Sequence, residues 1–149
     1  MKPVYVLLVM AFAVVTLSCK SKQKSMTDGK ANADLQETYW KLVEINGKKP
    51  GPTPAGKREM HIKFRKEQNR LEGFGGCNGL GATYELKEGN RIHISAVIST
   101  QIACSDLEIE NALKQALETA DNYSINGLNL SLNKARMAPL ARFEAVYFH

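Results

Sequence analysis

Long apolar runs are missing from this 149-residue chain. The longest, from Val4 to Leu17, is interrupted only by Thr16 and falls short of the roughly 20 residues that a membrane-spanning helix needs. Blocks of five like charges are also missing, and the net charge of +5 at pH 7 is spread along the sequence. These absences argue against a transmembrane helix and against a basic arm that binds nucleic acid, so we expect no nucleic-acid partner.

The spacings that mark common metal and nucleotide sites are absent as well. The three histidines, His61, His93 and His149, are scattered, and with the cysteines they lack the short ligand spacing of a zinc site. The glycine-rich stretch from Gly73 to Gly81 lacks the G-x-x-x-x-G-K-[ST] spacing of a phosphate-binding loop. We therefore expect neither a metal nor another cofactor.

The first residues have the pattern of an export signal. A short positive start containing Lys2 precedes the apolar run, which has the length of a signal-peptide core. The run ends in Thr16-Leu17-Ser18-Cys19, which resembles a bacterial lipobox, although leucine is commoner than threonine at its first position. We predict a lipoprotein signal peptide over residues 1–18 and lipidation of Cys19, which would anchor the chain to a membrane. The alternative is a plain secretory signal with a chance cysteine.

Two cysteines remain after Cys19, and they form an even pair in an exported chain. Cys77 and Cys104 would meet an oxidising compartment, where a disulfide is their expected state. Such a bond would be worth about 3.5 kcal/mol by the chain-entropy model. The alternative is two free, buried thiols.

The rest of the chain divides into a tether and one domain. Residues 19–37 follow the anchor and are rich in lysine and small polar residues, which predicts a flexible tether. The folded domain is predicted over residues 38–149. Lys20 follows the lipidated cysteine, so the aspartate that favours inner-membrane retention is absent. We therefore expect the outer membrane, facing the periplasm.

Alternation of apolar and polar residues predicts antiparallel strands through most of the domain. In residues 91–97, for example, Ile92, Ile94 and Ala96 are expected to face one side. The expected strands cover residues 39–45, 58–66, 70–75, 83–86, 91–97, 123–125, 128–132 and 140–148.

One helix is expected between residues 105 and 121. Ser105 as N-cap and Glu108 three positions later fit a capping box. Acidic Asp106, Glu108 and Glu110 lie in the first turns, where the helix dipole favours them. Apolar residues at helical spacing predict a stripe that packs on the core; they are Leu107, Ala112, Leu113, Ala116, Leu117 and Ala120.

The glycine-rich stretch Gly73–Gly81 is expected to form a tight connection between two strands. Glycine permits positive φ angles and close backbone approach, and it weakens regular elements. Asn78 is expected as a turn residue. With Cys77 at its centre, the stretch is interpreted as a staple that joins the first strands to the helix through Cys104.

Three segments, together with the closing Phe143, resemble one protein family, the META domain, also called HslJ-like. They are the opening Tyr39-Trp40-Lys41-Leu42, the Gly75-Gly76-Cys77-Asn78 turn, and Ser99-Thr100-Gln101-Ile102-Ala103-Cys104, in which the family often has methionine at the position of Ile102. The resemblance covers about residues 38–148. Its motif residues here are Gly75, Gly76, Cys77, Asn78, Thr100, Ala103 and Cys104.

The resemblance implies an α+β fold, in which an antiparallel β-meander forms a partly open, cracked barrel with one packed helix. Family members are often bacterial envelope lipoproteins associated with heat-shock response and drug tolerance, without an established enzymatic activity. It implies a non-enzymatic envelope protein that acts through contacts with another envelope protein, with no catalytic residue. The alternative is a carrier of a small apolar ligand or acyl chain in the barrel cleft, by analogy with secretin pilot proteins.

Two further hypotheses remain open from the residues alone. Cys77 and His93 would form a thiol–imidazole pair if they met and Cys77 were free, although no third orienting group is identifiable. Six aromatic residues would either fill the core, which we favour, or line a cavity; they are Trp40, Phe64, Phe74, Tyr84, Phe143 and Tyr147.

Overall fold

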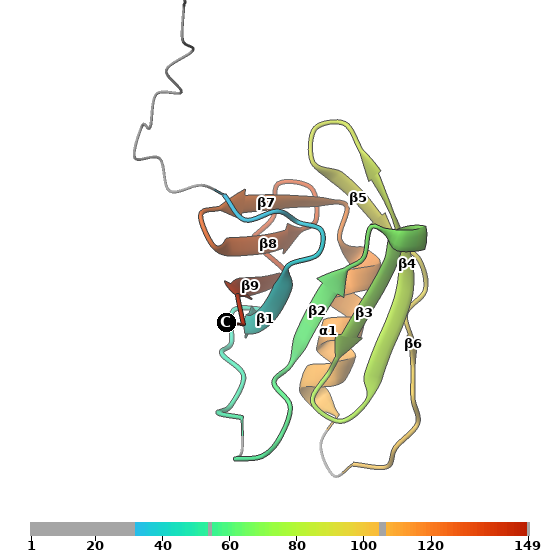
Figure 1. Cartoon of the computed structure of the whole chain (residues 1–149), viewed down its shortest axis with the longest axis vertical. Helices are drawn as coiled ribbons and strands as arrows, with labels where there is room; N and C mark the ends of the chain where they lie inside the picture. The colour runs from blue at the N-terminus through green and yellow to red at the C-terminus, as the bar shows by residue number, and fades with distance from the viewer. Residues whose placement is uncertain (1–31, 54, 105–106, 149) are drawn as a thin grey trace, which may run out of the picture.

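The computed structural model describes residues 32–53, 55–104 and 107–148 (Figure 1). Strands dominate this part of the chain, together with one α-helix and one 3₁₀ turn. The strands are β1 (Tyr39–Ile45), β2 (His61–Phe64), β3 (Arg70–Phe74), β4 (Gly79–Lys87), β5 (Arg91–Ile94), β6 (Ile98–Ser99), β7 (Asn122–Asn126), β8 (Asn129–Asn133) and β9 (Ala141–Val146). The 3₁₀ turn is η1 (Glu67–Asn69) and the helix is α1 (Glu108–Thr119). The predicted signal peptide, Cys19 and most of the predicted tether lie outside the described residues.

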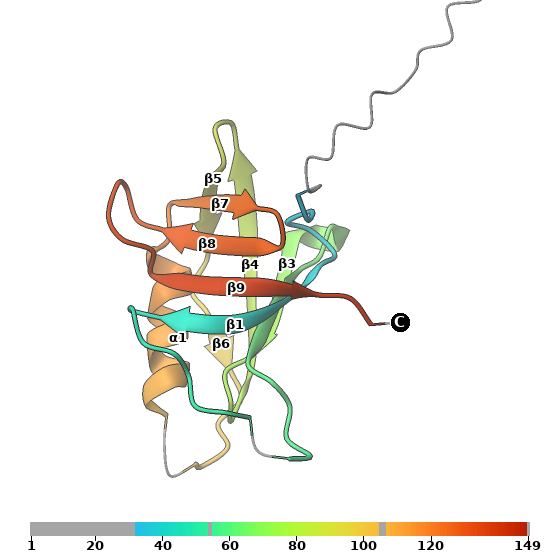
Figure 2. The ribbon, with the colours of Figure 1, turned by 90° about the vertical axis from the view of Figure 1, so that its left-hand side faces the viewer.

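The strands form one antiparallel sheet whose pairings return to their starting point. The order is β3-β2-β1-β9-β8-β7-β5-β4-β6, and β3 also pairs with β4. Hydrogen bonding around this ring is uneven, since β5 and β7 share only the register pair Arg91 and Asn122. Figure 2 shows β7, β8, β9 and β1 as neighbouring strands with α1 beside them. The predicted antiparallel α+β architecture with a single helix is confirmed, and the strands form a ring with uneven hydrogen bonding.

Large apolar side chains fill the inside of the ring. Trp40, Phe64 and Phe143 are all fully buried, and α1 adds Leu113 and Leu117. These residues come from alternate positions of their strands and from one face of the helix, as the sequence pattern predicts. The core is therefore packed by side chains contributed from both halves of the chain.

Two of the six aromatic residues do not belong to this core. Tyr147 lies beyond the end of β9 and is 53% exposed. Phe74 is only partly buried, because it faces outward from β3 and stacks near the His61 ring. The expectation of a filled core is confirmed for the other four residues, including Tyr84.

The strand predicted over residues 91–97 is broken after Ile94. Ile92 and Ile94 are buried as expected, but Ala96 is exposed and Val97 is buried instead. The alternation shifts by one residue in the link between β5 and β6, where Ser95 donates its backbone N–H to the Thr83 carbonyl at 2.9 Å. An inserted residue of this kind reverses the facing of the side chains that follow it.

The helix begins later than the capping box predicted. Leu107 is the N-cap of α1 and makes no side-chain capping bond. Glu108 is therefore the first helical residue and not the third, and Ser105 lies outside the described residues. The predicted apolar stripe is confirmed by the burial of Leu113, Ala116 and Leu117.

Residues 32–37, predicted as the end of the tether, pack on the domain. Ala33 and Leu35 are buried, and the Leu35 carbonyl accepts a hydrogen bond from the Trp40 indole N–H at 2.9 Å. The Gln36 amide donates to the Tyr84 hydroxyl at 2.6 Å. The domain thus extends at least to residue 32, six positions before the predicted boundary.

The glycine-rich stretch is only partly a connection. Residues 75–78 make the turn, whereas Gly79 and Gly81 belong to β4. A Cβ on Gly73, in β3, would lie 2.7 Å from the His61 carbonyl oxygen on the adjacent strand. Close approach of strands therefore explains Gly73 inside β3.

None of the helices in the described residues is long and apolar enough to cross a membrane.

Candidate functional site

The motif residues converge on one side of the domain, where the β3–β4 turn faces the segment after β6 and the start of α1. Cys77 in the turn and Cys104 in that segment form a disulfide, with their Cα atoms 6.3 Å apart. The bond links residues 27 positions apart. The predicted pairing is thus the one found in the structure, and the turn is stapled to the segment that leads into the helix.

Asn78 is the centre of a hydrogen-bond network around this disulfide. Its backbone N–H and its side-chain N–H₂ donate to the two carboxylate oxygens of Glu110, at 2.7 and 2.9 Å. Its side-chain oxygen accepts from the Thr100 hydroxyl and from the Ile102 backbone N–H, both at 2.8 Å. Thr100 Oγ1 in turn accepts from the Gly79 backbone N–H at 3.2 Å. One asparagine therefore joins the turn, the segment after β6, and α1.

Glu110 is the buried partner of this network. Its side chain also accepts a longer hydrogen bond from the Cys77 backbone N–H at 3.3 Å, and the residue is 4% exposed. Hydrogen bonds from several donors offset the cost of burying a carboxylate. Within the described residues, no buried side-chain nitrogen or oxygen lacks a hydrogen-bond partner. The network is therefore complete within the protein.

Glu110 was missed as a site residue by sequence reasoning, which attributed it to the helix dipole. A signal was present in the spacing: Leu113 and Leu117 lie three and seven positions later, on the same face of the helix. An acidic residue in line with buried leucines has to find donors inside the fold. The turn formed by Cys77 and Asn78 supplies them.

The two glycines of the turn are required by their surroundings. A Cβ on Gly75 would lie 2.5 Å from Glu110 Cγ and 2.9 Å from its carboxylate oxygen. Gly76 has φ +110°, and a Cβ there would lie 2.8 Å from the end of the Met60 side chain. Both positions therefore exclude a larger residue. Ala103 is exposed, and nothing in the structure explains why alanine stands there.

The other sequence-predicted groups are not brought together with this network. His93 is exposed on β5, opposite Glu85, and Cys77 is bonded to Cys104, so the thiol–imidazole pair is not formed. No group of three or more potential metal-binding side chains occurs in the described ranges. Cys19 and His149 lie outside them.

His61 lies in a row of rings on the outer face of the sheet. Its ring stacks on Tyr39 with centroids 4.3 Å apart, and Phe74 lies on its other side at 6.5 Å. Burial lowers the pKa of His61 below its ordinary value, and the hydrogen bond between its Nδ1 and the Glu59 carbonyl opposes this effect. Arg58 ends the row, with its guanidinium 5.3 Å from the centre of the Phe74 ring.

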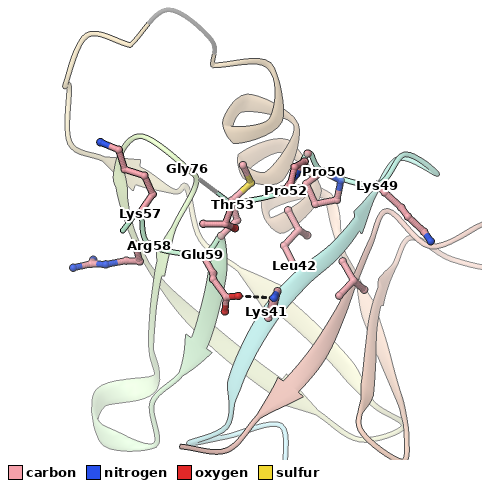
Figure 3. Close-up of a pocket in the computed structure, with 13 residues that line it drawn as sticks. Lys41, Leu42, Lys49, Pro50, Pro52, Thr53, Lys57, Arg58, Glu59 and Gly76 are labelled. Carbon is pink, nitrogen blue, oxygen red and sulfur yellow. Dashed lines mark hydrogen bonds and ion pairs between the residues drawn. The ribbon is translucent and has the colours of Figure 1, made fainter. Parts of the chain in front are cut away.

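A pocket of about 530 Å³ opens next to the motif turn (Figure 3). It lies where β1 and β2 separate, beyond the hydrogen bond from Leu42 N–H to the Met60 carbonyl at 2.8 Å. Residues 49–53 of the β1–β2 loop form another wall, and Gly76 borders the pocket from the motif turn. Apolar lining comes from Leu42, Val43, Pro50, Pro52 and Met60.

The charged lining of this pocket is mainly positive. Lys41 forms an ion pair with Glu59, the one carboxylate among the lining residues. Lys49 and Lys57 have no ion pair within the described part of the chain, and Arg58 faces the Phe74 ring. Figure 3 shows Lys49 on one side of the pocket and Lys57 with Arg58 on the other. A concave site with an apolar lining and a few charged groups is the ordinary form of a small-molecule site.

Comparison with known proteins identifies the class to which this fold and turn belong. The META domain family model matches residues 33–147, which is most of the chain. The protein belongs to the META domain family, as the sequence motifs indicated.

Solved structures of similar fold are consistent with this assignment. One, described as an NMR structure of a protein, is 17% identical with a TM-score of 0.57, and the alignment covers 73% of this chain and 89% of that one. Another, an NMR structure of a protein from Burkholderia xenovorans, is 22% identical with a TM-score of 0.55 and coverages of 75% and 83%. At these identities the likeness concerns the fold alone. No functionally curated protein matches the sequence.

Proposed function

We propose that this META-domain protein is a lipid-anchored, non-enzymatic protein of the bacterial envelope. A lipid on Cys19 would hold it at the periplasmic face of the outer membrane, where it would act in stress tolerance or envelope maintenance through contacts with another envelope protein. The observation that carries this proposal is the disulfide between Cys77 and Cys104. Disulfides persist in exported chains and are rare in the cytosol, which supports the interpretation of residues 1–18 as an export signal.

The motif network supports a structural and not a catalytic use of the family motif. Cys77 is bonded to Cys104, so it offers no thiolate. The carboxylate of Glu110 and the amide of Asn78 bind each other and backbone groups. These hydrogen bonds fix the position of α1 against the β3–β4 turn, so both side chains already have partners within the protein.

Replacement of the anchor cysteine tests the proposal. Wild-type protein should sediment with membranes and float with them in a density gradient, whereas the Cys19→Ala variant should be recovered in the soluble periplasmic fraction. Ser21→Ala is the matched control, since it alters a neighbouring residue and leaves the cysteine. Membrane association of Cys19→Ala equal to that of wild type would refute the anchor. Crosslinking in intact cells with mass spectrometry would then identify the envelope protein that contacts the anchored form.

A second function, carriage of a small apolar ligand or an acyl chain, is favoured by the pocket beside β1. The core inside the ring is filled by side chains such as Trp40 and Phe64, so a carried ligand would lie in this pocket. Its volume of about 530 Å³ is in the range of small-molecule sites. This use is compatible with the anchor, and ligand titration tests it separately.

A further inference from the structure

The shape of the pocket beside β1 follows from an irregularity in the strand. β1 pairs with β9 continuously up to Leu42 and again from Glu44, with a register shift between them. Val43 is the additional residue of this bulge and lines the pocket. On the other edge, β1 and β2 share the register pairs of Trp40 and Lys41 only. The strands therefore part at this point, and the opening is built into the backbone and does not depend on one side-chain rotamer.

Apolar groups line the interior of the opening. Leu42, Val43 and Met60 come from the strands, and Pro50 and Pro52 come from the loop that closes one side. Proline at two alternating positions keeps this wall extended and removes two backbone donors from it. These apolar side chains cannot replace the water molecules around a compact ion, and they favour a ligand with an apolar body.

The charges around the opening are not balanced within the described structure. The lining residues include the cations Lys41, Lys49, Lys57 and Arg58 and one carboxylate, Glu59. The Lys41–Glu59 ion pair neutralises one cation, which leaves three without a carboxylate partner among the lining residues. Cations on both sides of a concave opening create a positive potential at its mouth. The flexible stems of the two lysines allow their ammonium groups to reach an anion at either edge.

We propose that this pocket binds single-chain anionic amphiphiles, with the apolar chain against Leu42, Val43 and Met60 and the anionic head at the mouth, where Lys49 borders one edge and Lys57 the other. This inference deepens the second function proposed above and rests on it. The head chemistry is a carboxylate or a phosphate ester, as in a free fatty acid or a single-chain phospholipid. A neutral amphiphile would make the apolar contacts without the attraction to the lysines. A free phosphate would be attracted to the lysines without making the apolar contacts.

Titration with matched amphiphiles tests this assignment. The full chain carrying Cys19→Ala is used, so that no lipid of its own competes. Laurate, dodecyl phosphate, dodecyl maltoside and inorganic phosphate are titrated separately, below the micelle concentration of each amphiphile, by calorimetry and by amide shifts in ¹⁵N spectra. We expect laurate or dodecyl phosphate to bind at least 10-fold more tightly than dodecyl maltoside, with shifts concentrated at residues 41–43, 57–60 and 76.

Charge reversal at the mouth supplies the control for specificity. Lys49→Glu/Lys57→Glu should weaken binding of the anionic amphiphiles at least 10-fold and leave binding of dodecyl maltoside unchanged. Lys87→Glu/Arg136→Glu changes the net charge equally at two exposed residues outside the pocket, and it should have little effect. Unfolding curves of both double variants establish that each is folded.

The outcomes separate the two levels of the proposal. Equal affinity for laurate and dodecyl maltoside, or equal effects of the two double variants, would overturn the charge selection while carriage of an apolar ligand survives. Binding of inorganic phosphate as tight as that of dodecyl phosphate would overturn the role of the apolar lining. Absence of binding by every dodecyl compound would overturn carriage itself, together with this inference.

Discussion

Glu110 and Asn78 explain why this family motif combines glycine, cysteine and asparagine. The asparagine satisfies both carboxylate oxygens of the buried glutamate and also binds the Thr100 hydroxyl. Gly75 leaves the room that the Glu110 side chain occupies. The residue types at positions 75, 78 and 110 are therefore explained by the contacts that these residues make with one another. The motif is therefore a structural joint between the β3–β4 turn and α1.

Replacing Glu110 should destabilise the domain strongly. Glu110→Ala leaves the buried Asn78 backbone N–H without its acceptor. It also removes one acceptor of the Asn78 amide, which keeps the Ile102 carbonyl, and the longer hydrogen bond from the partly buried Cys77 N–H. We expect a loss of about 2–4 kcal/mol in the free energy of unfolding, because one fully unsatisfied buried donor costs roughly 1–3 kcal/mol and the two weakened donors add to that cost. Urea denaturation at pH 7 measures it.

Glu108→Ala is the matched control for Glu110→Ala. Glu108 lies two positions earlier on the exposed face of the same helix, in an exposed ion pair with Lys48 at 3.9 Å. Removing it should cost less than about 1 kcal/mol. Equal losses for the two variants would show that the buried network does not stabilise the domain.

His61 gives the domain a dependence on pH in the weakly acidic range. Its pKa is lowered in the folded protein, so the unfolded chain takes up a proton at higher pH than the folded chain does. The contribution of the neutral ring to stability is complete above about pH 6.5, and it is lost as the pH falls from there through the folded pKa. His61→Phe keeps a ring beside Tyr39 and cannot titrate.

The urea midpoints of both proteins at pH 7.5 and 5.5 measure this contribution. The midpoint of the wild-type protein should fall more between these pH values than the midpoint of His61→Phe. Identical falls in the two proteins would assign the pH dependence to other groups.

The disulfide and the helix act together at the scale of secondary-structure elements. The bond fixes the segment that runs from β6 to α1, and the Asn78–Glu110 hydrogen bonds fix the first turn of the helix beside it. The two attachments are independent in chemistry, since only the first responds to reductant. Removing one should therefore weaken the joint without abolishing the fold.

Cys77→Ser/Cys104→Ser should lower the free energy of unfolding by about 3.5 kcal/mol, the chain-entropy value for a loop of this length. The variant should remain folded, with ¹⁵N shift changes largest near residues 75–79 and 100–113. Thermal denaturation with and without reductant measures the effect, and the wild-type protein in reductant should approach the variant. A wild-type protein that does not respond to reductant, and that equals the variant, would contradict the stabilising role of the bond.

The sequence predicted these elements well where local pattern and packing agree. The strand beginning at Tyr39 and the apolar stripe of α1 follow directly from periodicity. Ala96 could not be placed correctly, because the shift between β5 and β6 depends on a hydrogen bond from Ser95 to Thr83 on another strand. Residues 32–37 could not be recognised as part of the domain, since contacts such as that of the Gln36 amide with the Tyr84 hydroxyl join this short segment to a residue 48 positions away in the sequence.

Less of the site than of the fold could be predicted from the sequence. Cys77 and Cys104 were paired by counting cysteines, and the structure contains that pair. The role of Glu110 could not be predicted, because it depends on which backbone N–H groups of the β3–β4 turn lie next to the start of α1. The pocket beside β1 was equally hidden, because it results from a bulge at Val43 and from the parting of two strands.

At the scale of the whole molecule, the protein is a META domain stapled by the Cys77–Cys104 disulfide, and we propose that a lipid on Cys19 anchors it. The disulfide between Cys77 and Cys104 is a bond that persists in an oxidising compartment. The pocket beside β1 has mainly positive charges around it. The proposed anchor would determine where such a surface acts, because it would confine the pocket to the neighbourhood of a membrane. The lipid anchor is therefore the central claim of the proposed function, whereas ligand binding is tested separately.

The intact mass of the protein purified from membranes tests that claim most directly. We predict a mature chain that begins at Cys19, carries acyl groups on that residue, and gains the mass of two hydrogen atoms when the Cys77–Cys104 bond is reduced. A mature chain that begins elsewhere, or that begins at Cys19 without an acyl group, would contradict the lipid anchor.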